Sequence, residues 1–83
     1  MNLEIVTPDS KVYEGEITSI ALPGIDGSFQ ILNNHAPIVS ALGTGKMTVI
    51  DSDNQTQEYE ISGGVVEMNN NKVIVLAESI WYL

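Results

Sequence analysis

The residues of this sequence that could do chemistry are few, and the single histidine is the first to consider. His35 lies in the segment FQILNNHAPIVSALGTG, between two asparagines and an Ala-Pro pair. A catalytic histidine needs a nucleophile or a carboxylate within hydrogen-bonding distance, and a third group that orients its ring. Neither Ser40 nor Ser62 lies in the G-x-S-x-G pattern that exposes a nucleophilic serine. We therefore expect His35 to be a structural residue at a corner of the chain, and we expect no catalytic residue.

Metal and nucleotide sites are not expected either. One histidine without a second histidine or a cysteine is a poor ligand set for zinc, and the sequence has no cysteine. The segment DSDN, residues 51–54, begins like a calcium-binding loop but lacks the glycine and the closing glutamate of such loops, so a hairpin turn is the better interpretation. The segment GTGKMT departs from the phosphate-binding pattern G-x-x-x-x-G-K-[ST] at two positions. We predict no metal and no cofactor.

The net charge narrows the class of partner. The chain of 83 residues carries 11 acidic side chains against 3 basic ones, for a formal charge of −8. Such a surface repels nucleic acid and anionic membrane surfaces, and it attracts basic proteins. The N-terminus MNLEIVTPDSK lacks the basic and apolar regions of a signal peptide, and no apolar run reaches the ~20 residues that span a bilayer. These observations predict a soluble protein, cytoplasmic unless a partner tethers it to a membrane.

The elements that position these residues are predicted to be β-strands. Apolar residues alternate with polar ones or form short β-branched runs, and turn residues interrupt them at short intervals. The pattern indicates one all-β domain over residues 1–83, built as two packed sheets. Eight or nine strands are expected, in the ranges Leu3–Thr7, Lys11–Glu14, Glu16–Leu22, Ser28–Leu32, Pro37–Leu42, Lys46–Asp51, Gln55–Ser62, Val65–Met68 and Lys72–Glu78.

Several details of this pattern carry further expectations. The glycines of GTG, residues 43–45, and the pair Gly63-Gly64 are expected to end strands. The run VIVLA, residues 73–77, is apolar on both faces, which indicates either a central strand or one whose outer face meets a partner. The terminal IWYL, residues 80–83, either folds back onto the sandwich or docks on a neighbour.

Two motifs give the sequence a resemblance to a known family. G-x-F-x-I-L-x-x-H-A-P begins at Gly27, and S-G-G-x-x-E begins at Ser62. In this order and separation they resemble the N-terminal β-sandwich domain of the epsilon subunit of bacterial F-type ATP synthases, over Leu3 to about Glu78. The resemblance implies a sandwich of about ten short, mainly antiparallel strands. It also implies a non-catalytic subunit of the rotor's central stalk that links the gamma subunit to the c ring and supports the coupling of ion flow to ATP synthesis.

The resemblance implies two contact surfaces as well. The loop that faces the c ring matches Gly24, Ile25, Asp26, Gly27, Ser28 and Phe29. The surface that faces gamma matches His35, Ala36, Pro37 and Ile38, together with Val65 and Val66 of the second sheet. The carboxylate of Asp26 suits the basic polar loops of a c ring. The implied location is the cytoplasmic face of the bacterial inner membrane, in a peripheral complex without direct insertion into the bilayer.

Three matters stay open from the sequence. Family members usually continue into a C-terminal helical hairpin that inhibits ATP hydrolysis. If 83 residues are the natural length, the missing hairpin implies that this chain has no such inhibition and no nucleotide site. The alternative is a shortened chain. A free-standing carbohydrate- or peptide-binding sandwich is the second hypothesis, for which one Trp, three Tyr and one Phe supply few cleft-lining aromatics. A small hydrolase using His35 is the third.

Overall fold

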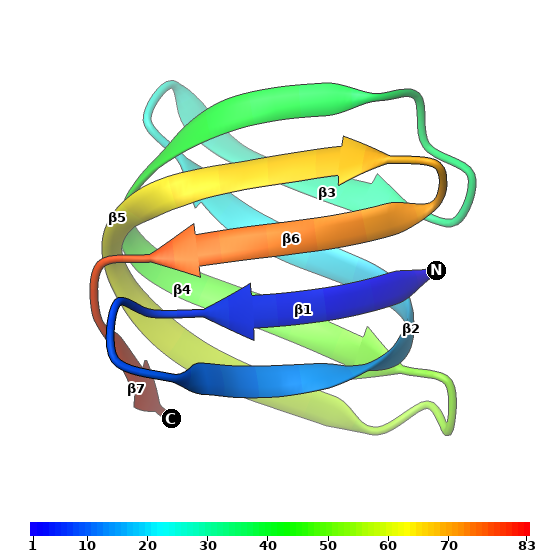
Figure 1. Ribbon diagram of the computed structural model, residues 1–83, viewed down its shortest axis with the longest axis horizontal. Coiled ribbons are helices and arrows are strands. Elements are labelled where there is room, and N and C mark those ends of the chain that lie inside the picture. The colour runs from blue at the N-terminus through cyan, green and yellow to red at the C-terminus, as the bar shows by residue number, and fades with distance from the viewer.

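The computed structural model of residues 1–83 consists of β-strands joined by short turns (Figure 1). The strands are β1 (Asn2–Val6), β2 (Lys11–Gly24), β3 (Gly27–Leu32), β4 (Ile38–Asp51), β5 (Thr56–Asn69), β6 (Lys72–Ala77) and β7 (Ile80–Tyr82). The predicted all-β class is confirmed, and every pairing is antiparallel except that of β1 with β6. The strands number seven in place of about ten, because β2, β4 and β5 are continuous over 14 residues each.

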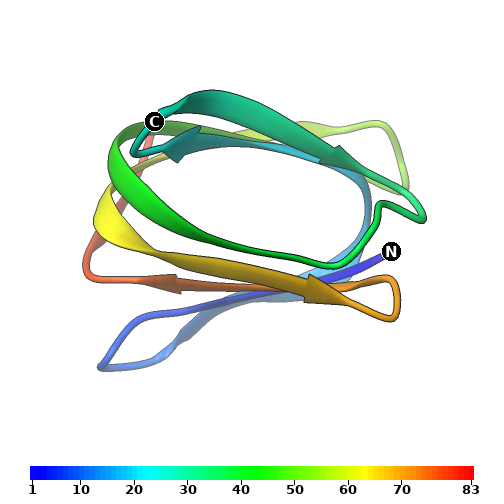
Figure 2. The same ribbon diagram turned by 90° about the horizontal axis from the view of Figure 1, so that it is seen from above.

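These three long strands each pass from one layer of the sandwich to the other (Figure 2). The first layer contains β1, β6, the N-terminal halves of β2 and β4, and the C-terminal half of β5. The second layer contains β3, β7 and the other halves of the long strands. A strand that bends in its middle can bury one face in both layers, so few chain reversals are needed.

The pairing of β1 with two neighbours closes the sheet into a barrel. The strand order is β1-β6-β5-β4-β2-β3, and β1 also pairs with β2, while β7 is attached to β5. Leu3 lies between Val73 on one side and Gly15 on the other. Closure satisfies the backbone groups of β1 and β6 on both edges, which leaves the first layer with open edges only at the N-terminal halves of β2 and β4.

Alternating side chains fill the interior between the layers. A single cluster of 17 buried apolar residues forms the core, and Tyr59 is the largest of its fully buried side chains. In β5 the predicted alternation is confirmed: Tyr59 and Ile61 are buried, and Glu60 between them is exposed. The run VIVLA forms β6, a strand between β1 and β5 whose odd-numbered residues, Val73, Val75 and Ala77, face the core.

Two predicted turns form where the sequence placed them. At DSDN, Oδ1 of Asp51 accepts hydrogen bonds from the backbone N–H groups of Asp53 and Gln55, both at 2.9 Å. At NNN, Asn70 and Asn71 have φ values of 52° and 57°. Asparagine tolerates this left-handed region, and two such residues in succession make the tight turn between β5 and β6.

The glycines of GTG and the pair Gly63-Gly64 do not end strands, contrary to expectation. The register of β4 with β5 continues without a shift from Leu42 opposite Gly64 to Thr44 opposite Ser62. Gly63 and Gly64 have φ values of 88° and 145°. A glycine can turn a strand as well as end it, and here these glycines bend β5 from the second layer into the first.

Replacing Tyr59 with phenylalanine tests the burial of its hydroxyl. The hydroxyl donates a hydrogen bond to Oε1 of Gln57 at 3.0 Å, and burial raises the pKa of Tyr59 above its ordinary value of 10.0. A raised acid pKa contributes stability that is present below pH 10 and is lost as the pH rises through the folded-state pKa. We expect Tyr59→Phe to lose about 1 kcal/mol at pH 7 and then to fall less steeply than wild type above pH 10. Urea unfolding across this pH range measures both effects.

Candidate interaction surface

His35 lies at a solvent-exposed corner between β3 and β4. Its backbone N–H donates to the carbonyl of Leu32 at 3.1 Å, and its Nδ1–H donates to the carbonyl of Ala36 at 2.8 Å. Ala36 and Pro37 are exposed, and Ile38 is half-buried at the start of β4. The imidazole therefore orients the corner through local bonds, and no side-chain nucleophile or carboxylate is bonded to it.

The position of His35 leads to a prediction about stability. Because the ring is exposed and its one hydrogen bond is to the adjacent residue, His35→Gln should change the free energy of unfolding by less than about 0.5 kcal/mol. Thermal unfolding followed by circular dichroism measures the change. A loss of several kcal/mol would mean that the ring supports the fold through contacts other than these.

The loop predicted to face the c ring is a tight hairpin between β2 and β3. Gly24 pairs with Gly27, so Ile25 and Asp26 form the tip, and both are exposed. Ser28 is exposed on β3, whereas Phe29 is half-buried and packs against the core. Of the six predicted residues, Phe29 and Gly24 are thus parts of the framework that holds the tip.

Val65 and Val66 were expected on one surface, and the structure separates them. Successive residues of a strand point to opposite faces. Val65 is 40% exposed on the outer face of the first layer, whereas Val66 is fully buried in the core and unavailable to a partner. Val65 pairs with Ala41, three residues along β4 from Ile38 at the start of the strand.

A row of apolar side chains crosses the outer face of the first layer. Val6 of β1 is opposite Leu76 of β6, Leu76 is opposite Val65 of β5, and Val65 is opposite Ala41 of β4. The row continues at the hairpin tip, where the N–H of Ile25 donates to the carbonyl of Ala41 at 3.2 Å. Leu76 is 52% exposed and Ile25 is 64% exposed. Five apolar side chains in one line across adjacent elements are unlike the scattered single ones of an ordinary surface.

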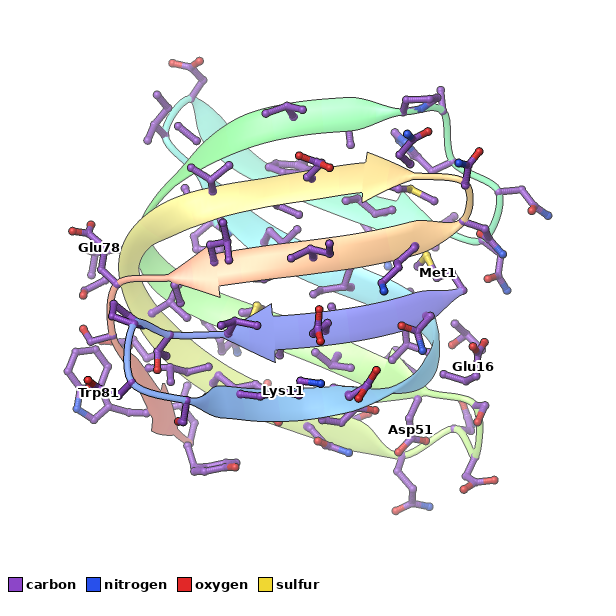
Figure 3. All side chains as sticks on the ribbon, viewed as in Figure 1. Met1, Lys11, Glu16, Asp51, Glu78 and Trp81 are labelled. Atoms are coloured by element: carbon purple, nitrogen blue, oxygen red, sulfur yellow. The ribbon has the colours of Figure 1, made fainter.

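A shallow hollow of about 530 Å³ adjoins this apolar row. Its lining is mainly apolar and includes Val6, Leu42, Val65, Leu76 and Ala77, and Thr7 and Glu78 supply polar groups. Glu78 follows β6 directly, at the end of the barrel where Figure 3 labels it together with Trp81. The hollow therefore lies at the end of the barrel away from the asparagine-rich turn at residues 69–71.

The second layer has polar residues at the centre of its outer face and exposed apolar residues, Leu32 of β3 and Trp81 of β7, on its outer strands. Lys46, Glu58, Glu60 and Thr48 lie on its β4 and β5 portions, and Nζ of Lys46 is 3.2 Å from Oε2 of Glu58. In the first layer, by comparison, the apolar side chains form one unbroken row across paired strands, which suits that layer to burial against another protein.

The C-terminal segment folds back onto the barrel and leaves three side chains exposed. Residues Ile80–Tyr82 pair with β5, Ile80 packs on the core, and the ring of Tyr82 lies 5.1 Å from that of Tyr59. Trp81, Tyr82 and Leu83 stay more than half exposed. The prediction that this segment folds back onto the sandwich is confirmed, and docking on a neighbour stays a prediction.

Reasoning from the sequence missed four residues of this surface, namely Val6, Ala41, Leu76 and Glu78. One signal pointed to Leu76, because the VIVLA run is apolar on both faces. No signal placed Val6 and Ala41 in line with it, since these residues are joined only by the pairing of four strands.

No group of three or more His, Cys, Asp or Glu side chains is arranged to hold a metal ion. The structure has no helix long and apolar enough to cross a membrane.

Comparisons with known proteins give the family of this fold. The family model described as the beta-sandwich domain of the ATP synthase Delta/Epsilon chain matches residues 1–82. The ATP synthase epsilon chain of Chlorobium limicola is 44% identical over 94% of this chain and 89% of its own length. The epsilon chain of Maridesulfovibrio salexigens is 49% identical over 92% of this chain, but the match spans only 53% of that longer protein.

Two solved structures share the fold. A chain of the Euglena gracilis mitochondrial ATP synthase, in a structure of OSCP, F1 and the c-ring, superimposes with a TM-score of 0.91 at 21% identity, over 96% of this chain and 51% of that one. A chain of the Tetrahymena thermophila mitochondrial ATP synthase central stalk and c-ring gives 0.82 at 17% identity, over 98% and 65%. The closed sandwich, its full-length match to the family model and its relatives at 44–49% identity lead to one conclusion: this chain belongs to the ATP synthase delta/epsilon chain family, through its beta-sandwich domain.

Proposed function

We propose that this chain is a subunit of the central stalk of the ATP synthase rotor, and that it works by contact and not by catalysis. The outer face of the first layer packs on the gamma subunit, and the hairpin tip at Ile25 and Asp26 faces the c ring. In this arrangement the chain lies on the cytoplasmic face of the bacterial inner membrane without entering the bilayer. Its relatives are named ATP synthase epsilon chains, and its structural neighbours come from assemblies that contain the c-ring.

The observation that carries the gamma contact is the apolar row from Val6 through Leu76 and Val65 to Ala41. An exposed Leu in the middle of a closed barrel adds nothing to its core, and burying such a row against a partner releases water from all of its members. The row reaches the hairpin tip through Ile25, so one continuous surface joins the two proposed contacts.

The closed barrel suits a part that transmits torque. In the strand cycle β1-β6-β5-β4-β2 every member is held by backbone hydrogen bonds on both sides over part of its length. Such a body resists shear between its layers, because three strands run through both of them and the interior is closely packed. Load applied at the gamma-facing surface is therefore passed to the hairpin tip without internal rearrangement.

Binding to the gamma subunit of the same organism tests this function. Sedimentation velocity of the mixed proteins should give a complex of one copy of each, with a Kd of about 1 μM or tighter. The complex, and not either protein alone, should then bind membranes that contain the c ring. Failure to form any complex at about 50 μM, a concentration at which even a weak specific contact is populated, would rule the proposal out.

A further inference from the structure

The hollow on the first layer has the carboxylate of Glu78 at its edge. The backbone N–H of Glu78 donates to the carbonyl of Gly63 at 3.1 Å. The side chain of Glu78 lies over Gly63, where its Oε2 occupies the space that a Cβ on Gly63 would need. Gly63 thus leaves room for this carboxylate beside the apolar lining of the hollow.

No cation of the chain neutralises Glu78. The ammonium groups of Lys11 and Lys46 lie 3.0 to 3.2 Å from carboxylates on other parts of the barrel. The third lysine, Lys72, begins β6, at the end of that strand opposite to Glu78. With a formal charge of −8 for the whole chain, a cation that pairs with Glu78 would have to come from another molecule.

The shape and chemistry of the hollow select one kind of side chain. An apolar lining with a single carboxylate at its edge fits a group that is apolar along its stem and cationic at its tip. Arginine and lysine are the side chains of this form. Leu76 and Val65 offer surface for the methylene groups, and Glu78 offers charge-assisted hydrogen bonds to the head group.

We propose that this hollow takes one arginine or lysine side chain of the gamma subunit, with its stem over Leu76 and Val65 and its head group on Glu78. This inference rests on the proposed function and adds to it the chemistry by which the partner is recognised. The apolar row supplies most of the buried area, while Glu78 fixes how gamma is oriented on it, because a buried cation placed elsewhere on the row would lack a counter-charge.

Isothermal titration of the gamma subunit into the chain tests the inference with two variants of equal charge. Glu78→Gln removes the carboxylate and is expected to weaken binding by about 10-fold or more, the typical loss for a charge-assisted hydrogen bond. Asp53→Asn removes an exposed carboxylate from the turn near Asp51, at the opposite end of the barrel (Figure 3), and should leave the Kd within about 2-fold. Glu78→Asp, which keeps the charge, should retain most of the affinity.

The outcomes separate this inference from the proposed function. If wild type binds gamma and Glu78→Gln binds equally well, the ion pair is wrong and the rotor function stands. If Glu78→Gln and Asp53→Asn weaken binding equally, only the overall charge matters, and the inference is again wrong. If wild type does not bind gamma at all, both fall. Thermal midpoints of the variants, expected within about 2 °C of wild type for exposed positions, exclude loss of folding as the cause.

Discussion

Gly64→Ala is expected to lower the free energy of unfolding by about 4 kcal/mol and the melting temperature by roughly 15 °C or more. A Cβ at this position would overlap the carbonyl oxygen of Leu76, and it would lie 3.0 Å from the Cα of Ala77. Both atoms belong to the backbone of β6, so neither can move aside as a side chain could. The φ of 145° at Gly64 adds conformational strain for any residue with a Cβ. For a domain of this size such a loss is a large part of the total stability.

Gly27→Ala separates the two causes of this loss. Gly27 also has a positive φ, of 130°, but a Cβ there would have no atom within 4 Å. It should therefore cost only the conformational strain, about 1 to 2 kcal/mol. Urea unfolding of both variants measures the difference. Equal losses would show that strain alone accounts for Gly64, and that β5 and β6 can separate at the bend without cost.

The course of the strands could be predicted from the sequence, but their continuity could not. Alternation within TQEYEIS and asparagine turns at NNN are local signals, and both predictions are confirmed. A glycine in a strand, by contrast, either ends the strand or bends it, and the glycine alone does not show which of the two occurs. At Gly43 and Gly63 the outcome depends on neighbouring strands that keep pairing across the bend. That information lies in long-range pairing. Mergers across Gly15, GTG and Gly63-Gly64 turn the nine predicted segments into six strands, and β7 is the seventh.

Only part of the candidate surface could be predicted from the sequence, for the same reason. His35, Ile25 and Asp26 are exposed as expected, because turn residues seldom lie in a core. The expectation for Val66 is wrong because successive residues of a strand face opposite sides, so only one of two adjacent valines can face a partner. The pair Val65-Val66 alone does not show which one that is. The alignment of Val65 with Leu76 is a property of register, which no local motif contains.

Leu76→Asp is expected to weaken binding to gamma by about 100-fold or more, the largest effect of any exposed position. Leu76 is in the middle of the apolar row, flanked by Val6 and Val65, and central side chains of an interface carry most of its energy. An aspartate there removes the largest apolar side chain of the row and places a second carboxylate beside Glu78, which would be desolvated without a partner. The cost to folding should stay below about 1 kcal/mol, because Leu76 points outward from β6.

Leu32→Asp is the matched control for this variant. Leu32 is 53% exposed and Leu76 is 52% exposed. Leu32→Asp makes the same change of side chain and charge as Leu76→Asp, but on β3 in the second layer. If the first layer is the gamma-facing one, only Leu76→Asp should abolish the complex, while both variants unfold at similar urea concentrations. The opposite result, in which Leu32→Asp fails to bind and Leu76→Asp does not, would assign gamma to the second layer. The apolar row across β1, β6, β5 and β4 would then bind a subunit other than gamma, because a line of water-exposed leucine and valine side chains is typical of an interaction site.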